Sequence, residues 1–493
     1  MLKIKKYLFL LLVSMTIGNA TAQNLSYNVE LSGNAGSGDY APFWHISNRQ
    51  GIMSQENSSG YIRAGLAGDY KFGNSDWSIN CGIDFISTKN HTSTVYIQQA
   101  FADVSWKMFT LSMGQKERWA PLKNHRLSTG GLTESGNARP IPQIRLEVPE
   151  YWDIFRTNGW FTLRGHLAYG WFSDGNWQED FVVKGNSYTT GVRYHSKALF
   201  GKFGNEKKFP LTFEGGVHMV AQFGGTSYNH LNKEGETMTN PTRFKDYLLI
   251  LIPGRGDSQY GGADQANVAG NHLGSYYLAF KWHEKDWLLS TYYEHTFEDH
   301  SQMFWEYGIW TEQLVGIELT LKNCKWVKGV ALEYFNLKNH GGPIYHDTTS
   351  DIPDQISCGD SNYTHGFYNG WFNYGMIIGT PLVTSPIYNT DGVLTCYNNR
   401  LEAFHIGIEG EPLSYLGYRV LLTHSNNWGT YKNPFTEIKN NTSGMLEITY
   451  KPHFLKGFDV KASFAFDKGE LYGDNYAGML TISKRGIIDI FKK

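Results

Sequence analysis

The stretch from Leu273 to Thr296, LGSYYLAFKWHEKDWLLSTYYEHT, decides the fold of this chain. Every second residue from Tyr276 to Trp282 is aromatic or aliphatic, and the second arm, from Trp287, repeats this period of two. Such a period is typical of a β-strand, because successive side chains leave opposite sides of the pleat. Each arm is about ten residues long, which lets a tilted strand cross a bilayer. The stretch predicts a transmembrane hairpin whose tight turn is HEKD.

The composition of the whole chain favours the same class of protein. Its 493 residues include 54 Gly, 31 Tyr, 29 Phe and 15 Trp, and only 18% are charged. The mean hydropathy is −0.40, and beyond the N-terminus no apolar run is long enough for a membrane helix. A barrel fits these values, because its apolar face uses only every second residue.

Segments with the same alternation, or enriched in Tyr, Val, Ile and Phe, recur along the chain and predict eighteen strands. An even number is what a bacterial single-chain barrel requires. The expected strands are 25–34, 60–72, 77–87, 95–105, 108–115, 140–148, 158–170, 186–197, 208–223, 273–282, 287–296, 311–322, 327–336, 400–410, 416–425, 443–451, 457–467 and 475–485.

The connections between these strands alternate in length. The short connections are 73–76, 106–107, 283–286, 323–326 and 411–415. The long ones are 35–59, 116–139, 224–272 and 337–399. Short periplasmic turns and long extracellular loops are typical of outer-membrane barrels, whereas a soluble sandwich or propeller has no reason to alternate them. We therefore expect an all-β, antiparallel transmembrane β-barrel, with segment 337–399 folded inward or capping the mouth.

The N-terminus predicts export. Lysines 3, 5 and 6 precede an apolar run and the sequence Ala20-Thr21-Ala22, which is typical of a secretory signal peptide over residues 1–22. Residues 23–493 then form one barrel domain in the outer membrane of a Gram-negative bacterium, in contact with its lipid. Without the three lysines, 41 basic residues stand against 46 acidic ones, a net charge of about −5. This balance does not suggest nucleic-acid binding.

Cysteines and short motifs give no sign of catalysis. The four cysteines form no C-x-x-C motif. Glu294 and His295 with Glu298, Asp299 and His300 could hold a metal or transfer protons, but a hydrated loop edge explains them better. Gly254–Asp257 with Asp264 fits no calcium motif, and no signature of a hydrolase, kinase or dinucleotide enzyme occurs. We expect no enzyme activity, no cofactor and no metal.

The expected outer loops are rich in aromatic, amide and arginine side chains. Examples are 44–49, 137–140, 368–374 and 424–428. Aromatic faces pack on the C–H faces of sugars, and amides hydrogen-bond their hydroxyls. Arginine adds bidentate recognition of carboxylates, which are frequent in acidic polysaccharides. Barrel packing alone can explain any single aromatic residue, so the clusters carry the prediction.

Several stretches together resemble the Wzi family of outer-membrane capsule assembly proteins, particularly its Bacteroides-type members. The matching stretches are YIQQAFA (96–102) leading to residues 111–114, NARPIPQIRL (137–146), Gly254-Arg255, YYEHTFED (292–299), YNGWFNYGMIIGTP (368–381) and HSNNWG (424–429). The resemblance implies an eighteen-strand barrel with a lectin-like role, which attaches capsular polysaccharide at the cell surface. It also implies contact with other capsule export components.

The polysaccharide-binding positions that this resemblance implies are Asn137, Arg139, Arg255, Glu294, His295, Trp371, Tyr374, Asn427 and Trp428. The enterobacterial members of the family begin with a periplasmic helical segment, whereas here a strand-like segment follows the cleavage site directly. The sequence therefore leaves open whether the lumen is plugged.

Three functions are consistent with the sequence. The first is a barrel that binds capsular polysaccharide and attaches or assembles capsule at the cell surface. The alternative is a porin or glycan-uptake channel, because eighteen strands can enclose an aqueous lumen. A hydrolase acting on lipid or glycan is a third, and it rests only on the His295 and His300 cluster.

Overall fold

The computed structural model of the chain describes residues 24–260, 268–298, 300–303, 312–340, 344–345, 356–357 and 361–488. The expected signal peptide, Asp264 and Cys358 lie outside the described residues. Within these ranges, no helix combines the length and apolar character that crossing a membrane requires.

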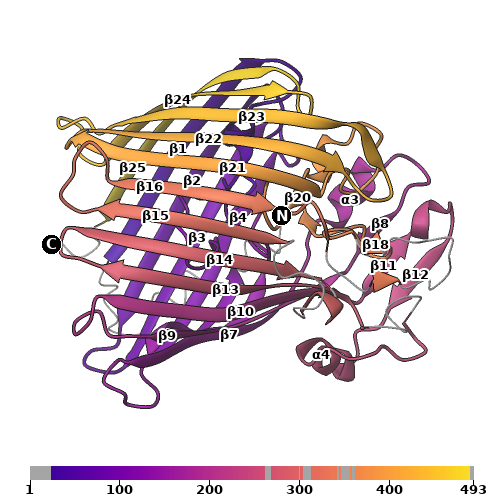
Figure 1. Ribbon diagram of the computed structural model, residues 1–493, viewed down its shortest axis with the longest axis horizontal. Helices are drawn as coiled ribbons and strands as arrows, with labels where there is room; N and C mark the ends of the chain where they lie inside the picture. The colour runs from indigo at the N-terminus through magenta and orange to yellow at the C-terminus, as the bar shows by residue number, and fades with distance from the viewer. Residues whose placement is uncertain are drawn as a thin grey trace.

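The main element is a closed antiparallel β-barrel of 18 strands (Figure 1). Each strand pairs with its sequence neighbour in the barrel, and the first strand also pairs with the last, from Leu25 opposite Ile488 to Ser37 opposite Tyr476. Closure leaves no free strand edge, which is the condition for placing a sheet in lipid.

The barrel strands are β1 (Asn24–Ser37), β2 (Ser58–Lys71), β3 (Trp77–Lys89), β4 (Val95–Trp106), β5 (Phe109–Gln115), β6 (Gln143–Trp152), β7 (Phe161–Trp171), β9 (Arg193–Phe203), β10 (Leu211–Phe223), β13 (Asn271–His283), β14 (Trp287–Phe297), β15 (Gln313–Leu321), β16 (Gly329–Asn336), β21 (Arg400–Leu413), β22 (Leu416–Gly429), β23 (Pro434–Tyr450), β24 (Phe458–Gly469) and β25 (Asn475–Ile488). These confirm the predicted fold class.

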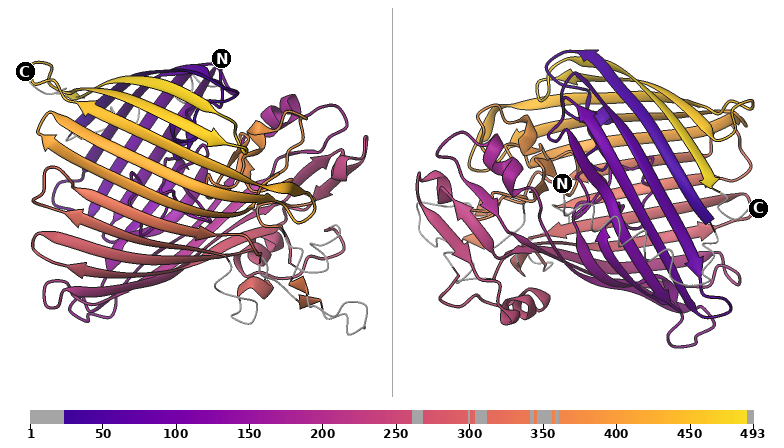
Figure 2. Two further views of the ribbon diagram at one scale, coloured as in Figure 1. Left: turned by 45° about the horizontal axis from the view of Figure 1, so that its top comes forward. Right: turned by 180° about the vertical axis from the view of Figure 1, so that it is seen from behind.

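Short elements lie in the connections. The additional strands are β8 (Tyr188–Thr190), β11 (Gly225–Tyr228), β12 (Thr237–Asn240), β17 (Ile344–Tyr345), β18 (Ile356–Ser357), β19 (Phe372–Asn373) and β20 (Met376–Ile377). The helices are α2 (Phe43–Ile46), α3 (Gly175–Phe181), α4 (Phe244–Leu251) and the 3₁₀ turns η1 (His230–Asn232), η2 (His300–Met303) and η4 (Pro386–Tyr388). The turned views in Figure 2 show several of these elements gathered at one end of the barrel.

Most strand ends differ from the expected bounds by a few residues, and two strands differ more. The segment 186–197 is interrupted, because Gly191 has a left-handed φ of 68°, so β8 joins a separate sheet with β11 and β12. The segment 443–451 is longer than expected, since β23 begins at Pro434. The polar residues that start β23 do not alternate with apolar ones, so the period of two could not find them.

The hairpin from Leu273 to Thr296 has the expected geometry. β13 and β14 pair from Gly274 opposite Phe297 to His283 opposite Leu288. Phe280 is 51% exposed on the outer face, whereas its neighbour Ala279 is fully buried inside. The period of two therefore separates a lipid face from a lumenal face.

An aromatic belt surrounds the rim of short turns. Its rings contact one another from strand to strand, with centroids 6.1 Å apart for Trp77 and Trp106 and 4.5 Å apart for Phe161 and Phe203. Trp77 is 47% exposed and Phe203 is 52% exposed. Such a belt is what the interface between lipid and water selects.

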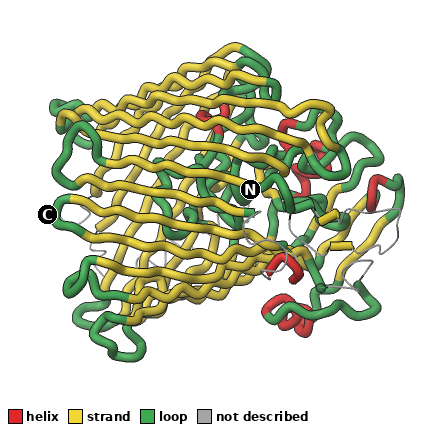
Figure 3. Tube along the Cα trace, viewed as in Figure 1, coloured by secondary structure: helices red, strands yellow, loops and turns green. Residues whose placement is uncertain are grey.

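The protein core lies in the lumen of the barrel. Three connections fold inward, 38–57, 116–142 and the described part 361–399 of the longest one, and we call them the plug. Their apolar side chains form one buried cluster with inward residues of the wall, among them Trp44, Leu132, Trp371, Phe335 and Leu401. Figure 3 shows loop segments, in green, behind the front strands and within the outline of the barrel.

Buried carboxylates on the wall hold the plug. Glu333 of β16 accepts hydrogen bonds from the Ser128 hydroxyl at 2.6 Å and from the Thr129 amide at 2.8 Å. Glu294 of β14 pairs with Lys123 and accepts the Leu132 amide at 2.8 Å. Segment 116–142, which begins and ends at β5 and β6, therefore crosses the lumen and is attached to the opposite wall.

Candidate functional site

The extracellular end of the molecule has a polar pocket of about 260 Å³, which we call the extracellular pocket. It lies where the loop before β9, the η1 turn, the plug and the β22–β23 turn meet. The polar lining residues are amides and hydroxyls, Ser187, Asn232, Ser361, Thr364, Asn369, Thr395, Tyr397, Thr430 and Asn433, with His365 and Lys432. Leu231, Val393, Leu394 and Cys396 add apolar surface.

Hydrogen bonds between these segments fix the walls of the pocket. Asn232 accepts the Ser187 amide at 2.8 Å through its side-chain oxygen. Asn369 donates to the Ser187 carbonyl at 3.2 Å. The Thr430 hydroxyl accepts the Asn433 amide at 3.0 Å, which closes the β22–β23 turn. The pocket is therefore formed before any ligand arrives.

The ionisable groups of the pocket are largely neutral near pH 7. Burial lowers the pKa of His365 to about 4, helped by the nearby rings of His272 and His230. Burial, with a hydrogen bond to Asp391, raises the pKa of Tyr397 to about 12. Lys432 is exposed and forms no ion pair with a described residue. The pocket thus offers neutral hydrogen-bonding groups and one cation.

Aromatic rings flank the β22–β23 turn. Trp428 is half-buried, with the Lys338 ammonium 4.7 Å from its ring centroid. The guanidinium of Arg400 lies 3.9 Å from the ring centroid of Tyr431. Aromatic faces beside amides are the combination that binds sugars.

The structure places most of the positions implied by the resemblance inside the protein. Asn137, Glu294, Trp371 and Asn427 are fully buried, and His295 is 2% exposed. The Trp371 indole donates to the Thr133 carbonyl at 3.2 Å, and the Asn137 amide donates to the Ile377 carbonyl at 2.9 Å. These side chains connect plug segments to each other, and their contact with sugar remains a prediction.

Glu294 and His295 do not act together. They are consecutive residues of β14, so Glu294 faces the lumen and His295 faces outward. The His295 ring nitrogens lie 3.1 and 3.2 Å from the carbonyl oxygens of Glu312 and Gln302. Asp299, which the sequence places in the same cluster, lies outside the described residues.

Arg139 and Tyr374 form one stacked unit. The Arg139 guanidinium lies 3.8 Å from the ring centroid of Tyr96 and 4.1 Å from that of Tyr374. It also donates to the Ser93 hydroxyl at 3.0 Å. Arg255, in contrast, is exposed. Of the positions implied by the resemblance, Arg255, Trp428 and Tyr374 keep accessible surface.

The pocket residues Tyr397, Lys432 and Asn433 were absent from the sequence prediction. Lys432 and Asn433 follow HSNNWG directly, in the turn TYKNP, so the position of this turn at the outer rim was the available signal. Tyr397 is brought near them only by the folding of the plug.

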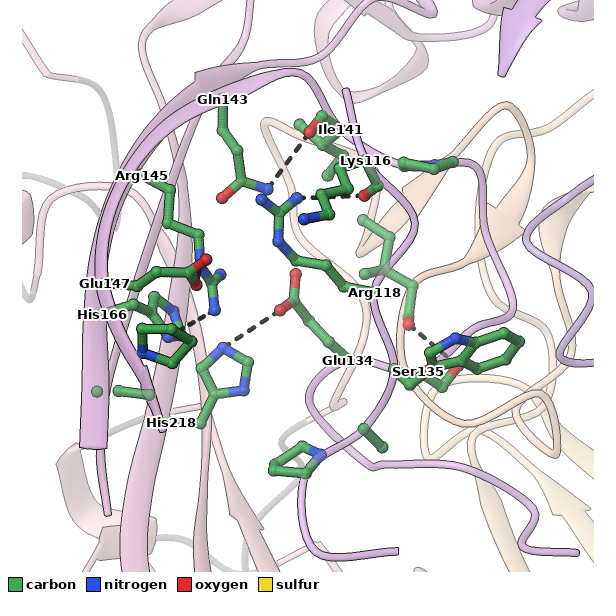
Figure 4. A pocket seen from close by; sticks show the side chains of 18 of the residues that line it. Lys116, Arg118, Glu134, Ser135, Ile141, Gln143, Arg145, Glu147, His166 and His218 are labelled. Atoms are coloured by element: carbon green, nitrogen blue, oxygen red, sulfur yellow. Dashed lines mark hydrogen bonds and ion pairs between the residues drawn. The ribbon is translucent and has the colours of Figure 1, made fainter. Parts of the chain in front are cut away.

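A second hollow, the lumenal cavity, has a volume of about 370 Å³ and lies between the plug and the inner faces of β6, β7, β9 and β10. Figure 4 shows Arg118 and Glu134 entering it from the plug, and Arg145, His166 and His218 entering it from the wall. Its hydrogen bonds run from Arg145 to His166 at 2.8 Å and from His218 to Glu134 at 3.2 Å.

Across the described residues, no group of three or more His, Cys, Asp or Glu side chains is arranged to hold a metal ion.

No protein-family model matches the sequence, and no curated protein is similar to it in sequence. Among solved structures, the chain is similar to Wzi of Escherichia coli, described as an outer-membrane protein involved in group 1 capsule assembly and as a carbohydrate-binding β-barrel. The TM-score is 0.56 at 13% identity, over 94% of this chain and 85% of Wzi.

Two other solved structures give lower TM-scores. OccAB4 of Acinetobacter baumannii gives a TM-score of 0.46 at 9% identity, over 95% of this chain and 99% of the other. OpdL of Pseudomonas aeruginosa gives 0.47 at 10% identity, over 94% and 99%. Taken with the lipid face, the aromatic belt and the closed sheet, the likeness to Wzi identifies the chain as an 18-stranded β-barrel of the Gram-negative outer-membrane type with a Wzi-like fold.

Proposed function

We propose that this protein binds capsular polysaccharide through its extracellular pocket and attaches or assembles capsule at the cell surface. The observation that carries the proposal is a preformed pocket of amides, hydroxyls and a tyrosine at the outer mouth of a barrel whose lumen holds a plug. Wzi, whose fold is similar, is described as carbohydrate-binding, and this likeness supports the proposal.

The plug argues against the alternative of an open channel. Segment 116–142 crosses the lumen, and hydrogen bonds to the buried carboxylates of Glu333 and Glu294 hold it there. An uptake route through the lumen would require these hydrogen bonds to break. The proposal assigns no reaction to the protein. Polysaccharide incubated with it should therefore stay at its original length, and shortened chains would favour the hydrolase.

A binding experiment tests the proposal. The probe is surface polysaccharide extracted from the bacterium that carries this gene, and the protein is held in nanodiscs. We expect Tyr397→Ala combined with Asn433→Ala to weaken binding at least about tenfold, since each substitution removes packing or hydrogen bonds from the pocket. Thr436→Ala is the control, because Thr436 is exposed nearby and does not line the pocket.

Two results would contradict the proposal. One is equal affinity of the double variant and the wild-type protein. The other is unchanged capsule on cells in which the gene is deleted. Interaction with other capsule export components is part of the same proposal, and co-purification from crosslinked cells measures it.

A further inference from the structure

The lumenal cavity is lined by more positive than negative side chains. Lys116, Arg118, Arg139, Arg145 and Arg164 contribute five cations, and Glu134 and Glu147 contribute two anions. Lys116 also pairs with Asp103 at 2.5 Å, which still leaves an excess of positive charge. His166 and His218 add two rings that hydrogen-bond through the Ser196 hydroxyl, at 2.8 and 3.1 Å. An excess of positive charge inside a barrel is costly unless something compensates it.

Both acidic side chains of the cavity already have partners. Glu147 accepts the Arg145 Nε at 2.6 Å. Glu134 lies 3.2 Å from His218 Nε2 and accepts the Tyr194 hydroxyl. Burial alone would raise the pKa of Glu134, but these hydrogen bonds and the charge of Arg145 hold it below its usual range. Glu134 therefore stays ionised and engaged.

Arg118 and Arg164 have no acidic partner within ion-pair distance among the described residues. Arg118 donates to the Lys116 carbonyl at 3.2 Å and to the Ser112 hydroxyl at 3.3 Å. Arg164 lies over aromatic rings, 4.8 Å from the centroid of Tyr151 and 5.2 Å from that of Phe200. Among the described residues, therefore, no carboxylate is in direct contact with either guanidinium.

Arg118 lies in the field of Arg145, which lines the same cavity. Burial, and then the charge of Arg145, lowers its pKa to about 10. At neutral pH Arg118 still carries its proton, and its guanidinium lines the same cavity as those of Arg145 and Arg164. Because Arg118 and Arg164 line the same cavity, an anion bound there would offset their positive charge and accept bidentate hydrogen bonds.

The exposure of the cavity wall increases toward the periplasmic rim. Arg139 is 4% exposed and Gln143 5% at the extracellular end. The side chain of Arg145 is 12% exposed and that of Glu147 16%, and Pro149 beyond them is exposed. From Gln143 to Val148 the strand rises by roughly 17 Å, which is enough for a short run of sugar units.

We infer that the lumenal cavity is a binding site for the carboxylate of an acidic saccharide that enters from the periplasmic side, with Arg118 and Arg164 as the residues that receive it. The inference rests on the proposed function, and it adds the chemical class of the glycan and a second point of contact. The two sites share no lining residue, so each can be removed separately.

Isothermal titration of the full-length protein in nanodiscs tests the inference. The probe is trigalacturonate, and the neutral control ligand is maltotriose. We expect wild-type protein to bind trigalacturonate and not maltotriose, and Arg118→Gln and Arg164→Gln each to weaken binding about tenfold. Arg156→Gln is the matched control, since Arg156 is exposed in the β6–β7 turn and does not line the cavity.

A second ligand separates two sources of the anion. Inorganic phosphate that binds with equal affinity, and is lost in the same variants, would overturn the assignment to a saccharide. Trigalacturonate binding that survives both substitutions would overturn the site itself. Because Arg118 also holds the plug, Arg164→Gln decides the outcome if Arg118→Gln fails to insert into membranes.

The two proposals fail in different ways. Suppose that trigalacturonate does not bind the wild-type protein, while the Tyr397→Ala and Asn433→Ala double variant binds surface polysaccharide more weakly than the wild type does. The lumenal site is then wrong and the proposed function stands. If the extracellular variant binds polysaccharide normally while Arg164→Gln loses trigalacturonate, the lumenal site stands alone.

Discussion

Single residues of the inner wall decide how closely the plug can approach it. Gly407 of β21 faces the lumen, and a Cβ there would lie against the Leu127 carbonyl oxygen, closer than real Cβ atoms approach. That carbonyl also lies 2.7 Å from His405 Nε2. The absence of a side chain at Gly407 is therefore what lets segment 116–142 reach the wall.

Gly407→Ala should displace Leu127 and weaken the attachment of the plug. We expect an increase in ion conductance in planar bilayers and faster hydrogen exchange over residues 124–129. Gly417→Ala is the matched control, because a Cβ at Gly417 would have its nearest neighbour at 3.4 Å, an ordinary contact. Identical conductance of the two variants would show that Leu127 does not depend on Gly407.

A buried carboxyl links the loop before β9 to the plug. The Asp174 carboxyl accepts a hydrogen bond from the backbone amide of Tyr374 at 3.0 Å and one from the side-chain amide of Gln178 at 3.2 Å. Burial raises its pKa to about 6. Because the folded protein then holds this proton more tightly than the unfolded chain does, the contribution of Asp174 to stability is largest at low pH. It decreases as the pH rises through about 6.

We expect the Tyr374 amide to exchange more slowly at pH 4.5 than at pH 6.5, after correction for the intrinsic rate. Asp174→Asn removes the titrating group, so its exchange should lose this dependence. Hydrogen-exchange mass spectrometry of both proteins measures the effect. A wild-type protein with equal protection at both pH values would contradict the assignment.

At the scale of elements, α4 covers the outside of the barrel. Ala221 and Phe223 of β10 face outward yet are fully buried, because Ile250 of α4 packs on them. The Tyr169 hydroxyl of β7 donates to the Tyr247 carbonyl at 2.8 Å. The helix therefore lies on the outer wall, near the ends of the strands on the loop side.

Ile250→Ala should loosen α4, since truncating a buried isoleucine costs about 2–5 kcal/mol. Trypsin should then cleave after Lys245 faster in the folded protein. Ile252→Ala is the control, because Ile252 is 76% exposed and its truncation should change stability by less than about 0.5 kcal/mol. Equal cleavage of both variants would show that α4 does not depend on Ile250.

At the scale of the whole molecule, the plug separates this barrel from an open pore. Replacing residues 118–137 by a short Gly-Ser linker removes the contacts with Glu294 and Glu333. We expect this variant to conduct ions steadily in planar bilayers, while the wild-type protein stays closed. A Gly-Ser replacement of 233–236, an exposed turn outside the lumen, is the control. A wild-type protein that conducts as the variant does would favour the channel.

The sequence by itself determined that the chain forms a β-barrel. Only the tertiary structure decided which segments fill the lumen and which side chains they bury. The alternation along a strand is a local pattern, because successive residues face lipid and lumen in turn. The hairpin that begins at Leu273 could therefore be predicted from the sequence alone. The plug depends on pairs far apart in the chain, such as Arg126 with Glu409 at 2.7 Å. No local pattern shows which loop crosses the lumen. Nor does it show that Trp371 is buried and Asn433 is exposed, since those outcomes depend on long-range packing.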